Sequence, residues 1–475
     1  MTLQELRILP PLAIGRLGSA TEPLDNYNLE VPEHDPLGFR KLVPAETLVV
    51  DRATGEITAR AVPKEIRFKS GDRIRPVAPF LEVWAVTSEG HMEPLTLELL
   101  AKNGLSPADV KWTVRVGNIK AYRRTTQPGD QVHADTGPIS DHKVHPLEGK
   151  CENFRTGKVL PLGSVQYIKP TRDFPEIRLR FTPAAGKVYG ASEKMVGPDG
   201  KEVHDPNLTP ETILYDPDKG GWRGYKEAPT GPTLTNPAQI YAGYAGPDNS
   251  WISRGYLDDE CDGIVSVELA VKDASGTARK LSAFARIAAG PPAFAPDSFP
   301  VRTVADELEQ ALLGPEAHAQ EAKLSDAEEI VRRAFETVRL MNTAVMNGNT
   351  IDGRVNVAST MVRQDTNDTG RLYEPIAAPS IVDNFALRNL HQQVFTALRS
   401  GTASWFTEVL RRYDEIGDLS DKGRRKMPAL MRGADGRYMA LTRRQVDIIR
   451  KTSHRELFQD GSQDAAPAIG KTGDQ

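Results

Sequence analysis

The side-chain types that most often bind metals are concentrated between residues 133 and 151. The candidate ligands there are three histidines and one cysteine: His133, His142, His145 and Cys151. Imidazole and thiolate groups suit zinc, which binds them in tetrahedral geometry. The spacing matches no structural-zinc pattern, and the segment supplies only one cysteine. Two interpretations therefore stay open, a metal site and a polar surface loop with scattered histidines, and the sequence favours the loop.

A second candidate is the acidic run from Asp258 to Asp262, which precedes Gly263. Carboxylate oxygens are the ligands that hard cations such as Ca²⁺ prefer. The run lacks the alternating ligand positions of a calcium loop. We therefore interpret it as a turn that leads into the following strand.

Motifs for other chemistry are weak or absent from the sequence. Gly15 and Gly18 are not followed by a predicted helix, so they indicate neither a dinucleotide fingerprint nor a phosphate-binding loop. Neither the nucleophile motif G-x-S-x-G nor the zinc motif H-E-x-x-H occurs. The sequence by itself therefore assigns no catalytic residue.

Composition limits the class of protein. The chain has 475 residues, of which 39% are hydrophobic and 26% are charged, a balance typical of globular proteins. Its net charge of −4 provides no general attraction for nucleic acid or an anionic membrane. Residues 381–455 are locally basic, which we interpret as a solvated helix face. We expect no nucleic-acid partner.

The sequence also predicts a cellular location. The N-terminal residues lack the basic and apolar segments of a secretory signal. No stretch reaches the roughly 18 apolar residues that span a bilayer, so we expect no membrane partner. Cys151 and Cys261 are too few for a disulfide framework. We therefore expect two reduced thiols in a cytoplasmic protein.

The fold class that the pattern predicts is mixed but mainly β. Up to about residue 300 the chain shows short alternating segments separated by Gly, Pro and Asp turns, which is typical of antiparallel sheets in a sandwich or a barrel. Clear examples are the hairpin of Thr47–Asp51 with Glu56–Val62, and the segments Lys111–Val116 and Glu176–Phe181. A second hairpin is formed by Ile264–Val271, which continues over the turn Asp273–Gly276 into Leu281–Ile287.

Near residue 300 the period changes from two to about 3.6, which indicates a helical region. Helices are predicted at 304–313, 325–346 and 383–399, and a last helix begins near Thr442. After Phe458 the composition is typical of a disordered tail. We therefore predict a β-rich body at 1–300, an α-helical region at 301–458 and a tail at 459–475.

Four segments, in order along the chain, resemble the LodA-like family of lysine and glycine oxidases, which use cysteine tryptophylquinone. They are Ala13–Ser19, the stretch from Lys64 through Val110–Lys120, Asn249–Gly263 and Pro291–Pro296. Leu441, Thr442 and Gln445 are similar to a later family motif, L-T-x-x-Q. The resemblance implies a β-rich fold with helical additions, and descent from enzymes that oxidatively deaminate amino acids.

In that family the cross-linked Cys and Trp of the quinone lie beyond the L-T-x-x-Q helix. Here no cysteine follows Cys261, and the last tryptophan is Trp405. We therefore expect no quinone or other cofactor, and we transfer no catalytic residue. Two hypotheses follow. The first is a non-quinone binding, scaffold or partner subunit, which forms a homo-oligomer or binds a protein partner or an amino-acid-type small molecule. The second is an active amino-acid or amine oxidoreductase that uses another cofactor, a metal at His133–Cys151, or a quinone from an unexpected residue pair.

Overall fold

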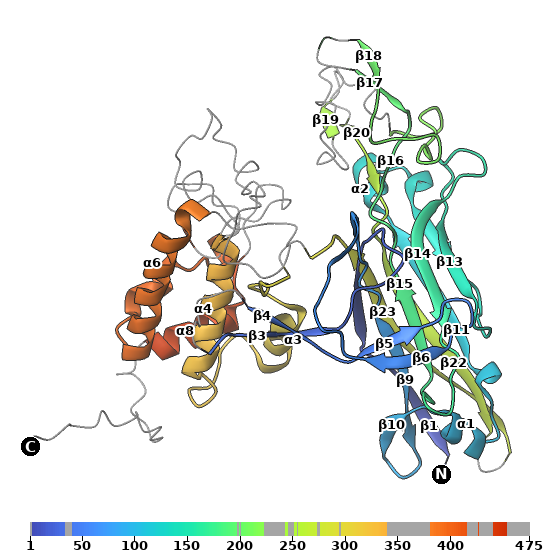
Figure 1. Ribbon diagram of the computed structural model, residues 1–475, viewed down its shortest axis with the longest axis horizontal. Helices are drawn as coiled ribbons and strands as arrows, with labels where there is room; N and C mark the ends of the chain where they lie inside the picture. The colour runs from blue at the N-terminus through green and yellow to red at the C-terminus, as the bar shows by residue number, and fades with distance from the viewer. Residues whose placement is uncertain are drawn as a thin grey trace, which may run out of the picture. The chain divides into compact units, whose positions relative to one another are not determined.

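The computed structural model describes most of the chain and divides it into two compact units (Figure 1). Unit 1 comprises Met1–Asn28 and Val43–Ala293, and unit 2 comprises Leu29–Leu42 and Phe294–Gln475. The described residues are 2–33, 40–196, 199, 201–222, 243–245, 251–253, 255–272, 276–293, 296–339, 381–415, 426 and 440–453. The tail predicted at 459–475 lies outside these ranges.

Unit 1 is built around two sheets. The strands of the first sheet lie in the order β1 (Leu3–Leu9), β9 (Phe80–Thr87), β15 (Arg178–Thr182), β14 (Leu160–Tyr167) and β13 (Val144–Gly149), with β10 (Met92–Pro94) also paired to β9. Those of the second lie in the order β12 (Val132–Asp135), β11 (Lys111–Asn118), β22 (Asp262–Lys272), β23 (Ala278–Gly290) and β2 (Leu12–Arg16). Only the β2–β23 pairing is parallel within these two sheets.

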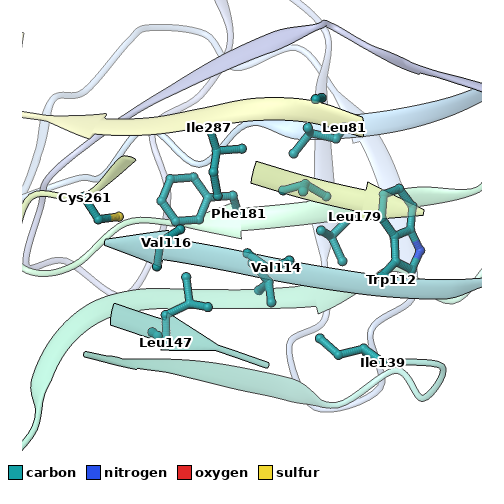
Figure 2. Packing of buried hydrophobic residues seen from close by; sticks show 14 of the residues in the cluster. Leu81, Trp112, Val114, Val116, Ile139, Leu147, Leu179, Phe181, Cys261 and Ile287 are labelled. Atoms are coloured by element: carbon teal, nitrogen blue, oxygen red, sulfur yellow. The ribbon is translucent and has the colours of Figure 1, made fainter. Parts of the chain in front are cut away.

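The two sheets share one hydrophobic core (Figure 2). Along β11 the predicted face of Trp112, Val114 and Val116 is buried, which confirms the alternation in the sequence. Leu179 and Phe181 of β15 are buried in the same core. Side chains from both sheets thus exclude water between them, which is the arrangement of a sandwich. The described strands form open sheets, so the predicted barrel alternative is wrong.

Two predicted hairpins are present in unit 1. β5 (Thr47–Val50) pairs with β6 (Ile57–Ala61), and β22 pairs with β23 along its whole length. The β5–β6 turn contains Gly55 at φ +75°, a left-handed conformation that glycine adopts without steric cost. Alternating segments joined by a turn were therefore sufficient to predict both hairpins.

The remaining elements are short helices, 3₁₀ turns and two-stranded pairs. Two helices are α1 (Leu97–Lys102) and α2 (Lys120–Thr125), and 3₁₀ turns are Pro107–Asp109, Pro128–Asp130, Ser404–Val409 and Tyr413–Glu415. Small two-stranded pairs are β3 (Tyr27–Glu30) with β4 (Lys41–Pro44), β7 (Lys69–Ser70) with β8 (Arg73–Ile74), β16 (Val188–Tyr189) with β21 (Leu257–Asp258), β17 (Lys194–Val196) with β18 (Glu202–His204), and β19 (Gly243–Ala245) with β20 (Trp251–Ser253).

Unit 2 is helical where it is described. Its helices are α3 (Val304–Leu313), α4 (Leu324–Arg339), α6 (Ile381–Ser400) and α8 (Arg443–Ser453). These bounds confirm the predicted helices, except that residues 340–346 of the second lie outside the described ranges. Among the helices that the structure describes, none combines the length and apolar character that crossing a membrane requires.

Helix caps and a buried ion-pair network stabilise unit 2. Thr303 and Asp306 form a capping box at the start of α3, which satisfies backbone donors that the first turn leaves free. Arg40, from the segment Leu29–Leu42, donates to Glu336 at 2.8 Å and to Glu329 at 2.7 Å. A segment distant in sequence therefore becomes part of the helical unit.

Candidate functional site

The histidines at 142 and 145 are each engaged by a neighbouring group. His142 Nδ1 lies 3.1 Å from the Tyr167 carbonyl oxygen, and its ring lies 4.7 Å from the Tyr167 ring. His145 Nε2 lies 2.8 Å from an oxygen of Asp141. The two imidazoles therefore have different partners and do not converge on a common point through these contacts.

The other two predicted metal ligands are His133 and Cys151. His133 is an exposed residue of β12, and Cys151 is half-buried against the core of unit 1. Because His133 lies on β12 and His145 on β13, the predicted surface loop is wrong for these two histidines. Burial raises the pKa of the Cys151 thiol to about 12, whereas a metal ligand must be the thiolate. Within the described ranges, no three His, Cys, Asp or Glu side chains come together in an arrangement that could hold a metal ion.

The acidic run instead meets the end of β11. Gly117 lies opposite Asp262 in the β11–β22 pairing, so Asn118 lies beside the residues that precede β22. The buried Asn118 side chain donates through Nδ2 to the Asp258 carboxylate and backbone oxygens, at 3.0 Å each, and to the Glu260 carbonyl at 3.0 Å. This amide fixes the shape of the acidic turn.

Lys120, the first residue of α2, neutralises part of the acidic turn. Its Nζ donates to Asp258 Oδ2 at 2.7 Å and to Glu260. Burial opposes the lysine charge, but the two carboxylates outweigh it and raise the pKa of Lys120. The run forms the predicted turn into β22, and Lys120 pairs with two of its carboxylates, those of Asp258 and Glu260.

Asp259 is the buried acid of this turn. One of its oxygens accepts hydrogen bonds from the backbone N–H groups of Gly186 at 3.1 Å and Lys187 at 3.0 Å. The other oxygen forms no hydrogen bond of regular geometry with the described residues, and the Tyr189 hydroxyl lies next to the carboxylate. Burial raises the pKa of Asp259 to about 7. Burial also raises the pKa of the adjacent Tyr189 hydroxyl, and the charge of Asp259 adds to the effect.

A second buried carboxylate, Asp130, lies just beyond the C-terminal end of α2. It accepts hydrogen bonds from the hydroxyls of Thr125 and Tyr215, and from Asn153 Nδ2 at 2.8 Å. Gly220 lies against this group, and a Cβ there would come within 1.9 Å of the Tyr215 hydroxyl. Glycine is therefore required for the hydroxyl to reach Asp130.

The α2 helix thus connects two carboxylate centres, the acidic turn at its start and Asp130 at its end. We call this group of side chains the sheet-end polar centre. Sequence reasoning missed α2, Asp130 and Tyr215. The sequence did contain a signal for part of this centre. Two of the segments that resemble the oxidase family contain Lys120 and Asp258, and the β11–β22 pairing brings these two segments together.

Unit 2 contains a cavity of about 230 Å³ whose charged side chains largely pair with one another. Arg333 contacts Asp306 at 3.1 Å and Glu329 at 3.2 Å, and Arg444 contacts Glu309 at 2.9 Å. These ion pairs stabilise the packing of α3, α4 and α8 around the cavity.

Comparison with protein-family models gives no match, and comparison with curated protein sequences gives none. Three similar solved structures are of the L-Lys epsilon-oxidase from Marinomonas mediterranea. A crystal structure of that enzyme has 16% identity and a TM-score of 0.36, and covers 72% of this chain and 46% of that chain. For the structure of its Schiff base intermediate with L-Lys, the identity is 14% and the TM-score 0.44, and the match covers 97% of this chain and 62% of that chain. For a third structure, the identity is 13% and the TM-score 0.43, and the match covers 98% of this chain and 63% of that chain. The chain spans less than two thirds of the length of that enzyme.

Proposed function

We propose that the chain is a non-quinone binding or scaffold protein related to the LodA-like amino-acid oxidases. The observation that carries this proposal is the sheet-end polar centre. Asp130 and Asp258 each accept hydrogen bonds from several donors of the chain itself. Such saturation favours a role in holding the fold, because a general base needs a free lone pair that reaches the substrate.

The state of the two thiols supports the same proposal. Burial raises the pKa of both Cys151 and Cys261 to about 12. Both are therefore neutral thiols near pH 7, and the thiolate is the form that attacks electrophiles or binds metals. Cys261 Sγ is directed to the Leu162 carbonyl oxygen at 3.4 Å, within the core of unit 1.

The proposal is tested on the purified full chain by a redox-cycling stain after denaturing electrophoresis, together with an intact mass. We expect no stained band, and a mass equal to that calculated from the unmodified sequence. A stained band with a mass that fits a Cys–Trp cross-link would contradict the non-quinone role. A known quinoprotein on the same gel controls for the sensitivity of the stain.

The alternative is an active amine or amino-acid oxidoreductase, and one observation favours it. Asp259 is buried, one of its oxygens forms no hydrogen bond of regular geometry with the described residues, and burial raises its pKa to about 7, which suits proton transfer. Peroxide release from a panel of amino acids, lost in Asp259→Asn, would favour this alternative.

In one form of this alternative the enzyme uses a metal cofactor, and elemental analysis tests for that metal. Near-equimolar zinc, copper or iron that is lost in the double variant His142→Ala/His145→Ala would place the metal at the predicted ligands. Metal that remains in the double variant would place it elsewhere.

Self-association is part of the scaffold proposal. The α3 helix exposes four large apolar side chains, Val304, Leu308, Leu312 and Leu313. The first three recur every four residues and therefore form one stripe. Such a stripe on one copy can cover the same stripe on a second copy, as in a two-fold symmetric interface.

A further inference from the structure

A small polar pocket lies on the face of β15 opposite to its core-facing side chains. The pocket has a volume of about 160 Å³. Its floor follows a row of cross-strand neighbours, because Val144 lies opposite Gln166, Gln166 opposite Arg180, and Arg180 opposite Phe80. Four strands of the first sheet, β13, β14, β15 and β9, therefore hold the floor in a fixed register.

The turn between β5 and β6 forms one wall of the pocket and is fastened to the sheet. Gln166 Nε2 donates to the Arg52 carbonyl at 3.0 Å. The backbone N–H of Lys169 donates to the Gly55 carbonyl at 2.9 Å, and its Nζ donates to Glu56 at 2.6 Å. These bonds position Arg52 at the pocket before any ligand binds.

Arg180 provides the central observation. Among the described residues, its buried Nε has no hydrogen-bond partner and its guanidinium forms no ion pair. Its Cζ atom lies over the Phe80 ring, 4.9 Å from the centroid. Burial lowers the pKa of Arg180 to about 10, and the charge of Arg52 adds to this effect. By contrast, Arg178, two residues earlier on the same strand face, pairs with Glu82 at 2.7 Å.

Hydroxyl groups line the same pocket as the Arg180 guanidinium. Thr21, Ser164 and Thr182 line the pocket, and in the part of the chain that the structure describes their hydroxyls make no hydrogen bond to another residue. Each hydroxyl can donate one hydrogen bond to an acceptor ligand. The pocket therefore presents a cation and several donors that the described residues leave unsatisfied.

We propose that this pocket binds a small oxyanion, a carboxylate or a phosphate, which Arg180 holds and Arg52 helps to neutralise. The planar guanidinium matches the geometry of both groups through paired hydrogen bonds. This inference goes beyond the proposed function, because either a scaffold or an enzyme can carry such a site.

Size and charge restrict the ligand further. A volume of about 160 Å³ is many times the roughly 15 Å³ that a single water requires, but is at the small end of ligand sites. Two arginines and the exposed Glu22 line the pocket, which leaves one net positive charge. The pocket therefore suits a compact anion of low charge.

Calorimetric titration of the full chain tests the proposal, with inorganic phosphate in one arm and malonate in the other. Ionic strength is held constant with sodium chloride, so that a general salt effect appears in both arms. We expect one of the two anions to bind at one site per chain. Arg180→Gln should weaken that binding at least about tenfold, because it removes the charge-assisted pair of hydrogen bonds.

A matched control and a second variant keep the test decisive. Arg73→Gln removes an exposed arginine outside the pocket, makes the same change in net charge, and should bind as the wild type does. Arg52→Gln alters an exposed side chain and keeps the backbone carbonyl that bonds to Gln166, and it should weaken binding several-fold. The proposal is overturned if neither anion binds the wild type at millimolar concentration, or if Arg180→Gln and Arg52→Gln both retain wild-type affinity.

Discussion

At the scale of single residues, Asp259 makes the stability of the fold depend on pH. Burial raises its pKa from 3.8 to about 7, so the folded chain holds this proton more tightly than the unfolded chain. The free energy of unfolding contributed by Asp259 therefore falls as the pH rises from about 4 to about 7, and is constant above that range. The shift corresponds to an upper limit of about 4 kcal/mol.

We predict that Asp259→Asn flattens this pH dependence and stabilises the chain at pH 8. Asparagine can still accept the two backbone hydrogen bonds and carries no buried charge. Denaturant unfolding at pH 5, 6, 7 and 8 measures the effect. Asp262→Asn, an exposed carboxylate on β22, is the control. An unchanged slope of stability against pH in Asp259→Asn would show that the carboxylate does not titrate in this range.

The second residue-scale prediction concerns Asp130. Tyr215→Phe removes one of the donors that satisfy this fully buried carboxylate. We expect the free energy of unfolding to fall by about 1–3 kcal/mol, because a buried acceptor then loses a hydrogen bond without gaining water. Urea unfolding at pH 7 measures the change. Tyr122→Phe, a half-buried tyrosine of α2, should have a smaller effect, and equal effects would count against the Asp130 network.

At the scale of elements, α2 is a short helix whose position depends on its side chains. A helix of six residues has little stability of its own in water. Lys120 fastens its start to Asp258 and Glu260, and Thr125 fastens its end to Asp130. The element therefore depends on tertiary ion pairs and hydrogen bonds.

We predict that Lys120→Met loosens α2 and the acidic turn. The variant leaves Asp258 without its ammonium partner, and we expect a loss of about 1–3 kcal/mol, because Lys120 itself is partly exposed. Amide hydrogen exchange should become faster in α2 and at residues 258–262. Exchange in α1, whose Thr96 cap is not altered, is the internal control. Unchanged exchange in α2 would mean that the ion pair does not position the helix.

At the scale of the whole molecule, the exposed stripe of α3 leads to a prediction about assembly. We expect the wild type to self-associate at micromolar concentration, and Leu308→Gln/Leu312→Gln to shift it toward monomer, because both side chains lie on the exposed face. Light scattering with sedimentation measures the masses. Val62→Gln, an exposed apolar residue of unit 1, is the control. A wild type that is strictly monomeric would exclude self-association.

Much of the secondary structure could be predicted from the sequence because it depends on near neighbours. Alternation along Lys111–Val116 placed β11 and its buried face, and the 3.6-residue period placed α3 and α8. The α2 helix was missed because Lys120–Thr125 is too short to show an apolar period. Ser404–Val409 forms a 3₁₀ turn, although Phe406, Val409, Leu410 and Tyr413 recur at the spacing of an amphipathic helix. Local patterns fail where an element is shorter than the period that would reveal it.

The sequence by itself determined the longer helices and several of the strands, that a sandwich was one of two β architectures, and that the acidic run forms a turn into a strand. Tertiary structure decided which polar groups become partners. Lys120 reaches Asp258 across 138 residues, whereas Arg180 lies in a pocket where the described residues offer its guanidinium no ion pair. The physical reason is the difference in the distance along the chain over which the two properties are set. The period of a segment depends on residues a few positions apart, but the partner of a charge depends on strand order and register, which the packing of the whole unit sets.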